Sequence, residues 1–218
     1  MKPLLAYAFL KSVRERFLWP LLFAAAVFLI APIVAVSVEA AATRNPWYPF
    51  LFPTMSAAET SVILTRALAC LSAVTAAAGA FWVYRTDIAD RSLSFLLMAM
   101  PHPLIVCGSA VIFGWCLAMT SFAIGTPIVI GALGGVPHAF ASTVLTAALL
   151  SVLNASTGCL FAVLSPAPGN VVNLIGVSLA AAALLSILPA VVMISCVTVA
   201  SVLALALASA KVEARCAG

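Results

Sequence analysis

Four formal charges stand alone in the middle of this chain of 218 residues. They are Arg85, Asp87, Asp90 and Arg91, and no other Asp, Glu, Lys or Arg occurs between Arg66 and Lys211. Charged side chains isolated in apolar sequence must lie in water or pair with groups of a protein, because an unpaired charge is costly to bury. These side chains could form ion pairs or bind a partner protein. The segment is therefore the best candidate for the place where a partner acts on the protein.

Helical spacing would gather these charges on one face. The positions i, i+3, i+4 and i+7 of such a helix are Asp87, Asp90, Arg91 and Ser94. We expect Thr86 to begin the helix as its N-cap, with the carboxylates near the positive end of the helix dipole. A short helix across one membrane face between two spans is typical of a coupling helix. An ordinary solvated loop helix has the same periodicity, so both interpretations stay open at this point.

The composition indicates an integral membrane protein. Hydrophobic residues make up 65% of the chain and charged residues 7%, whereas globular domains are typically about 25% charged. Repeated apolar runs of roughly 18 residues or more favour helical spans and disfavour a β-barrel, which would show short alternating segments. With so little chain outside the spans, we expect no soluble catalytic domain.

The fold class predicted is all-α, a polytopic membrane protein with six transmembrane helices. The charge-free run 171–208 is 38 residues long and would measure about 57 Å as one helix, nearly twice the ~30 Å hydrocarbon core. It must fold back, and residues 186–189 are the expected turn of a tight hairpin. The six spans expected are 18–38, 66–84, 104–133, 140–164, 171–185 and 190–208.

A single membrane domain, 1–218, accounts for the whole chain. It begins with an amphipathic interfacial helix, residues 1–16, whose stripe of Leu4, Leu5, Ala8, Phe9 and Val13 is expected to face the acyl chains. Residues 85–101 form the coupling segment between spans two and three, and residues 209–218 form a tail. With both termini inside, eight basic residues lie on the inner side and two on the outer side. The positive-inside rule therefore predicts that both termini and the coupling segment are cytoplasmic.

Several functional motifs are missing. The chain has no GxxxxGK[ST] sequence, so ATP would have to be hydrolysed by a partner chain. It has no CxxC or CxxCH, and its six cysteines are expected to be buried small hydrophobes without a metal or disulfide role. His102 and His138 are the only histidines, and a loop histidine is usually solvated or structural. We expect no cofactor, no metal and no catalytic residue in this chain, and the charge-free span interiors argue against a proton- or ion-driven transporter.

The segment after span two resembles a motif of a known family, the CcmB-type membrane subunit of the cytochrome c maturation ABC complex. That motif has the form acidic, apolar, any residue, acidic, Gly, Ser/Thr, Leu, followed by leucines and a proline. The matching positions here are Asp87, Ile88, Asp90, Ser92, Leu93 and Pro101. Arg91 stands where the family has glycine, and Ser94 stands where it often has an acidic residue.

The resemblance implies a permease subunit that couples ATP hydrolysis by a separate subunit to haem export or to release of a haem-loaded chaperone. The partners implied are a CcmA-like ATPase docking at Asp87, Asp90, Arg91 and Ser94, CcmC- and CcmD-like membrane subunits, and a periplasmic haem chaperone. The lipid bilayer is the remaining partner, and no nucleic acid is expected. Two other classes fit the sequence: a permease of another ABC exporter, for a drug, lipid or polymer, and an ATP-independent assembly scaffold.

Overall fold

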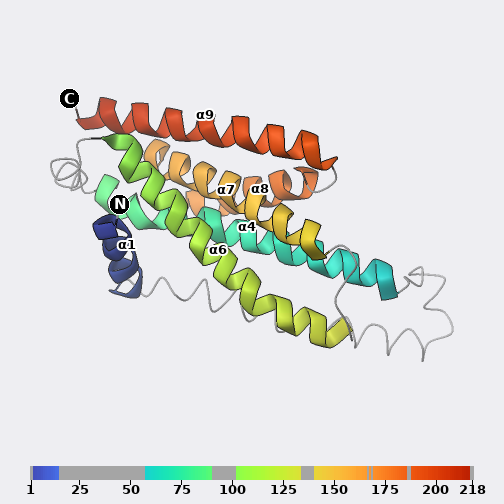
Figure 1. The fold of residues 1–218 in the computed structure, drawn as a ribbon. Coiled ribbons are helices and arrows are strands. Elements are labelled where there is room, and N and C mark those ends of the chain that lie inside the picture. Colours follow the sequence, from blue (N-terminus) through green and yellow to red (C-terminus); the bar gives the residue numbers. More distant parts are fainter. Residues whose placement is uncertain are drawn as a thin grey trace.

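The computed structural model describes residues 2–14, 57–89, 102–133, 140–165, 167, 169–185 and 188–216. Within these ranges the chain forms six helices and no strand, which confirms the all-α prediction for this part of the protein. The helices are α1 (Lys2–Arg14), α4 (Ala57–Ala89), α6 (Pro103–Leu133), α7 (Phe140–Leu164), α8 (Asn170–Leu185) and α9 (Ala190–Cys216). Figure 1 shows the five later helices as an elongated bundle with α1 across one end.

Four of these helices are long and apolar enough to cross a membrane. Their candidate spans are Arg66–Arg85, Pro103–Pro127, Phe140–Leu164 and Ala190–Ala214. They match the predicted second, third, fourth and sixth spans, whereas the predicted first span, 18–38, lies outside the described residues. The predicted fifth span is α8, an apolar helix of 16 residues. At 1.5 Å per residue it measures about 24 Å, less than the ~30 Å hydrocarbon core.

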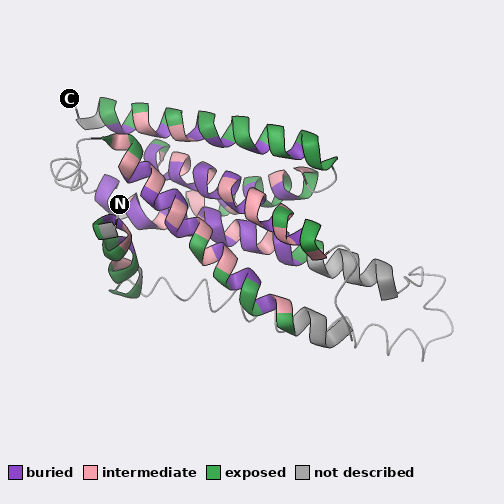
Figure 2. Cartoon of the chain, viewed as in Figure 1, coloured by how far each residue is buried: buried purple, intermediate pink, exposed green. Residues whose placement is uncertain are grey.

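The burial pattern of α9 is that of a helix in lipid. One stripe of the helix packs on the bundle, while the opposite face exposes large aliphatic side chains (Figure 2). The exposed set includes Val191, Val192, Ile194, Val199, Val202, Leu203 and Leu207. A water-soluble protein would place polar residues on such a face, because contiguous apolar surface is unfavourable in water. The chain is therefore a helical membrane protein whose outer surface meets acyl chains.

The helix pair α4 and α7 forms the centre of the bundle. The other helices pack around this pair: α6 contacts both members, α8 covers α4 and α7 on one side, and α9 covers α7 and α6 on another. α8 ends at Leu185 and α9 begins at Ala190, which confirms the predicted break in the 171–208 run, and the Leu188 amide donates to the Leu185 carbonyl over 3.2 Å.

The predicted tight hairpin of the last two spans is wrong. Ala182 of α8 packs with Ala73 and Leu150, while Met193 and Val197 of α9 pack with Leu153. Each helix thus buries one face against a different part of the central pair, and the two do not lie against each other along their lengths. The apolar run predicted the turn but not the partners of the helices that it joins.

Close backbone contacts hold α4 between α6 and α7. A Cβ added at Gly114 of α6 would lie 2.5 Å from the Ala76 carbonyl oxygen, and one added at Gly158 of α7 would overlap the Ala77 carbonyl oxygen. Gly79 of α4 faces Gly114 in return. Small residues allow this approach in membranes, where helices associate mainly by packing.

Hydroxyl side chains inside the spans hydrogen-bond mostly within their own helices. Ser156 donates to the Val152 carbonyl and Thr157 to the Leu153 carbonyl, each over 2.9 Å. Bonding back to a carbonyl one turn earlier satisfies the hydroxyl where no water is present.

The cysteines only partly follow the prediction that they are buried. Cys107 and Cys159 are buried between α6 and α7, whereas Cys116 and Cys196 are exposed on the bundle surface. All five cysteines described by the structure are unpaired thiols, including the half-buried Cys70. A thiol facing lipid behaves as a small apolar group, so exposure is compatible with the predicted packing role.

Replacing Gly158 by alanine tests the α4–α7 contact. We expect Gly158→Ala to lower the free energy of unfolding by about 1–3 kcal/mol, because its methyl group overlaps the α4 backbone. The matched control is Gly176→Ala on α8, where a Cβ meets nothing within 4 Å and a gain of up to about 1 kcal/mol is expected. Unfolding in mixed detergent, followed by circular dichroism, measures both. Equal stability of the two variants would contradict the contact.

Candidate functional site

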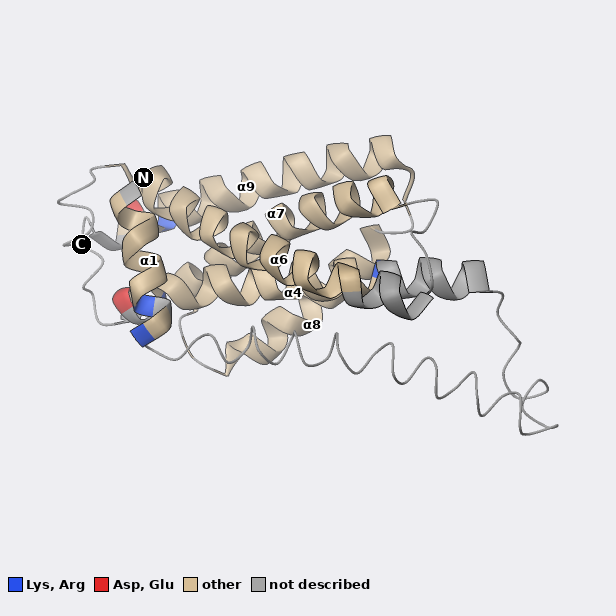
Figure 3. Ribbon diagram, turned by 60° about the horizontal axis from the view of Figure 1, so that its bottom comes forward, with Lys and Arg blue, Asp and Glu red and all other residues tan. Residues whose placement is uncertain are grey.

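The described charges gather at one end of the bundle. This end combines α1, the C-terminal ends of α4 and α9, and the N-terminal end of α6 (Figure 3). Leu4, Ile88, Val106 and Val212, one from each of these helices, share a single buried apolar cluster. The charged residues on these helix ends, with side chains described, are Lys11, Arg14, Arg85, Asp87, Lys211 and Glu213. Arg66 lies toward the opposite end of α4.

Asp87 is the centre of a polar cluster joining α4 to α1. Lys11 Nζ lies 2.7 Å from Asp87 Oδ2, and the two side chains are only 10% and 11% exposed. The Tyr7 hydroxyl donates toward both carboxylate oxygens, at 3.1 and 3.2 Å. Lys11 Nζ also lies 5.7 Å from the centre of the Tyr7 ring, within the range of a cation–π contact. Both groups stabilise the ionised carboxylate.

Helical spacing brings α1 to this position. Leu4, Ala8 and Lys11 recur on one face of α1, with Tyr7 beside them. Leu4 and Ala8 are buried in the same cluster as Ile88 and Val106, and Lys11 follows them along that face toward Asp87. A lysine in line with two buried aliphatic residues was the signal for this contact in the sequence, and our sequence reasoning missed it.

Only part of the α1 stripe that was expected to face lipid is exposed, and the rest packs against the protein. Leu4 and Ala8 pack against the protein, whereas Phe9 and Val13 are exposed, as is Leu10. Helical geometry explains the division, because residues five positions apart lie on different faces. The expected membrane contact thus reduces to one face of α1.

Thr86 does not begin a new helix. α4 continues from the apolar span through Thr86 to Ala89, so Asp87 lies in the last turn of α4 and not in the first turn of a separate helix. A carboxylate there gains nothing from the helix dipole, which favours cations at a C-terminal end. Lys11 and Tyr7 of α1 instead stabilise this carboxylate.

Most of the predicted docking residues lie outside the described residues. This holds for Asp90, Arg91, Ser92, Leu93, Ser94 and Pro101, and for His138. Ile88 is buried next to Asp87 and packs into the bundle. His102 is exposed directly before α6, and its carbonyl accepts the Ile105 amide over 3.0 Å in the first turn of that helix.

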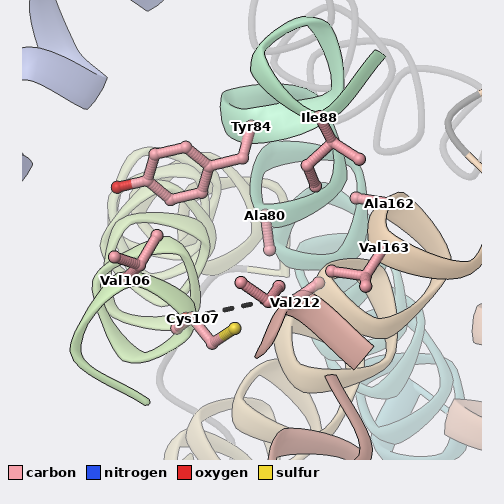
Figure 4. Close-up of a pocket in the computed structure, with 9 residues that line it drawn as sticks. Ala80, Tyr84, Ile88, Val106, Cys107, Ala162, Val163 and Val212 are labelled. Carbon is pink, nitrogen blue, oxygen red and sulfur yellow. Dashed lines mark hydrogen bonds between the residues drawn. The ribbon is translucent and has the colours of Figure 1, made fainter. Parts of the chain in front are cut away.

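A small pocket lies beneath this end of the bundle (Figure 4). Its walls are almost entirely apolar, formed by Ala80, Ile88, Val106 and Val212 among others. The Cys159 thiol, also in the wall, contacts the Cys107 carbonyl at 3.9 Å. Within the described ranges no three His, Cys, Asp or Glu side chains group as metal ligands.

Tyr84 closes one wall of the pocket and links α4 to α6. Its hydroxyl lies 2.7 Å from Ser109 Oγ, and Ser109 Oγ in turn donates to the Val106 carbonyl over 2.7 Å. Because the single Ser109 proton is used in that bond, Tyr84 must be the donor between the two side chains. This directional bond fixes α4 against α6 one turn before Asp87.

Arg85, also in the charged segment, contacts an aromatic ring of its own helix. Its guanidinium carbon is 4.8 Å from the centre of the Trp82 ring, three residues earlier on the same helix. A cation held over an aromatic ring at the end of a span suits the membrane interface, where both groups are favoured.

Comparisons with protein-family models, with curated proteins and with solved structures each found no significant match. The assignment of function therefore rests on the residues themselves.

The Tyr84–Ser109 bond predicts an asymmetric mutational effect. Ser109→Ala leaves the buried Tyr84 hydroxyl without its acceptor and should cost about 1–3 kcal/mol of unfolding free energy. Tyr84→Phe removes that hydroxyl and leaves the Ser109 proton bonded to Val106, so it should cost less, about 1 kcal/mol. Detergent unfolding curves of the two variants and of the double variant measure the difference. A larger cost for Tyr84→Phe would show that the bond runs in the opposite direction.

Proposed function

We propose that this chain is the transmembrane permease subunit of an ATP-driven complex of the CcmB type, which serves haem delivery in the assembly of c-type cytochromes. The observation that carries the proposal is the motif at residues 87–93, directly after an apolar span. Asp87, its first residue, lies where α4 leaves the apolar part of the bundle, beside the basic helix α1. A partner that binds the motif would act directly on the central helix α4.

The proposed topology has six spans with both termini on the cytoplasmic side of a bacterial inner membrane. It is supported by α1 and the C-terminal end of α9 lying at the same end of the bundle, as an even number of spans requires (Figure 3). The eight basic residues assigned to that side support the cytoplasmic orientation. In this topology α8 is the fifth span, and its short length requires its flanking turns or a locally thinner bilayer to complete the crossing.

α1 is the proposed interfacial helix. It carries exposed Phe9, Leu10 and Val13 on the side away from the bundle, together with the exposed cation of Arg14. Apolar and basic groups on one helix at the edge of a membrane bundle suit the headgroup layer, where rings and alkyl chains reach the acyl boundary and cations meet lipid phosphates.

A separate CcmA-like subunit supplies ATP hydrolysis in this proposal. The chain has no P-loop, and the charged segment 85–101 is the proposed docking element for that ATPase. Haem is the species handled by the complex, together with CcmC- and CcmD-like subunits and a periplasmic haem chaperone. This chain transmits the movement of the ATPase to the spans and takes no part in haem ligation.

Charge reversal at Asp90 tests the docking proposal. Asp90→Lys should reduce the amount of ATPase subunit that co-purifies with this chain by roughly ten-fold or more, as expected when a charged contact at an interface is reversed. Glu213→Lys is the matched control, because it reverses an exposed charge at the same end of the bundle outside the motif. Quantitative mass spectrometry of the purified complex measures both. Equal retention of the ATPase by the two variants would overturn the docking role of Asp90.

Native mass spectrometry with a visible spectrum tests the haem assignment. The proposal requires a nucleotide-binding subunit in the complex and a haem absorption band in the purified assembly or its chaperone. An ATPase partner in the absence of haem and of cytochrome maturation subunits would favour a permease of another exporter. Purification that yields no nucleotide-binding partner would favour an assembly scaffold.

A further inference from the structure

The ion pair of Lys11 and Asp87 joins residues 76 positions apart in the sequence. Both of its side chains are about nine-tenths buried. Three groups meet there, since the Tyr7 hydroxyl also contacts both oxygens of the carboxylate. Such an arrangement is specific, because removing either charge of a buried ion pair deprives the other of that counter-charge.

Among the described residues, α1 makes few other contacts. It has 13 residues, and a helix of this length is marginal on its own in water. Leu4 and Ala8 are its fully buried apolar side chains, while Phe9, Leu10 and Val13 face away from the bundle. The small apolar contact with α4 and α6 is therefore supplemented by a polar contact that has a defined geometry.

We propose that Asp87 acts inside the chain, as the positioning residue that fixes α1 on the end of α4, and not as a contact of an outside partner. Asp87 as a whole residue is only 8% exposed. Lys11 and Tyr7 together contact both of its carboxylate oxygens. α1 and the last turn of α4 then move as one unit. A displacement of the segment after α4 reaches the interfacial helix through this ion pair.

Hydrogen exchange of α1 in the full chain, reconstituted in nanodiscs of neutral lipid, tests the inference. Lys11→Gln and Asp87→Asn should each raise amide exchange in residues 2–14 by roughly ten-fold or more, because a released α1 is marginally stable. Peptides from α7 should be unchanged. Arg14→Gln is the matched control, since it removes an exposed cation from the same helix without touching Asp87, and it should leave α1 exchange within about two-fold of the parent.

The exchanged pair, Lys11→Asp with Asp87→Lys, separates a specific ion pair from a general loss of charge. It should restore most of the protection of α1, because the same two positions again carry opposite charges. The inference would be overturned if the single variants showed the same α1 exchange as Arg14→Gln. It would also be overturned if α1 in the exchanged pair were no better protected than in the single variants.

Retention of the ATPase tests whether Asp87 is a contact of an outside partner. This experiment, unlike the exchange experiment, rests on the proposed function. An exchanged-pair variant that keeps the ATPase supports an internal role for Asp87, whereas loss of the ATPase with α1 still protected would make Asp87 a docking contact. If the unmodified chain never co-purifies with an ATPase, the proposed function fails. The exchange experiment on the chain alone would still decide whether the ion pair holds α1.

Discussion

The backbone of α4 touches the backbones of α6 and α7, and the positions of the other helices depend on these contacts. Gly114 and Gly158 have no side chain where the Ala76 and Ala77 carbonyls pass, so the three helices approach to backbone contact. In lipid, apolar side chains gain little by leaving the solvent, and helix pairs are selected by how closely they pack. The small-residue surface of α4 is thus occupied by α6 and α7, and α8 and α9 pack on the outside of this three-helix centre.

The same contacts determine what happens at the charged end. With α4 and α6 held together by Gly114 and by the Tyr84–Ser109 bond, their ends form one apolar platform that includes Ile88 and Val106. α1 lies on this platform, and its Lys11 reaches the one carboxylate described in the last turn of α4. A shift of α4 relative to α6 would separate these groups, since an ion pair of this kind requires close geometry.

The sequence predicted the limits of some helices. The predicted spans 104–133 and 140–164 agree closely with α6 and α7, and the length of the 171–208 run required the turn before Ala190. The neighbours of each helix were not predictable, because valine, leucine and alanine occur on every face and hydropathy does not identify the packed one. The pairing of Lys11 with Asp87 was missed for a related reason, since it joins two distant segments through the tertiary fold. The continuation of α4 through Thr86 also differs from expectation, because a residue that suits an N-cap does not by itself end the helix before it.

Asp87 is central both to the sequence motif and to the contacts at this end of the protein. In the sequence it is the first acidic residue of a motif that resembles a docking element, and in the structure it is covered by a basic helix of its own chain. A buried ion pair adds little net stability compared with apolar packing, and its clearest use in proteins is to specify one arrangement among several. Here the arrangement specified is the position of α1 relative to α4, the most enclosed helix of the bundle. A partner that pulled on the segment after α4 would therefore displace an interfacial helix as well as a span, and the membrane surface would take part in the response.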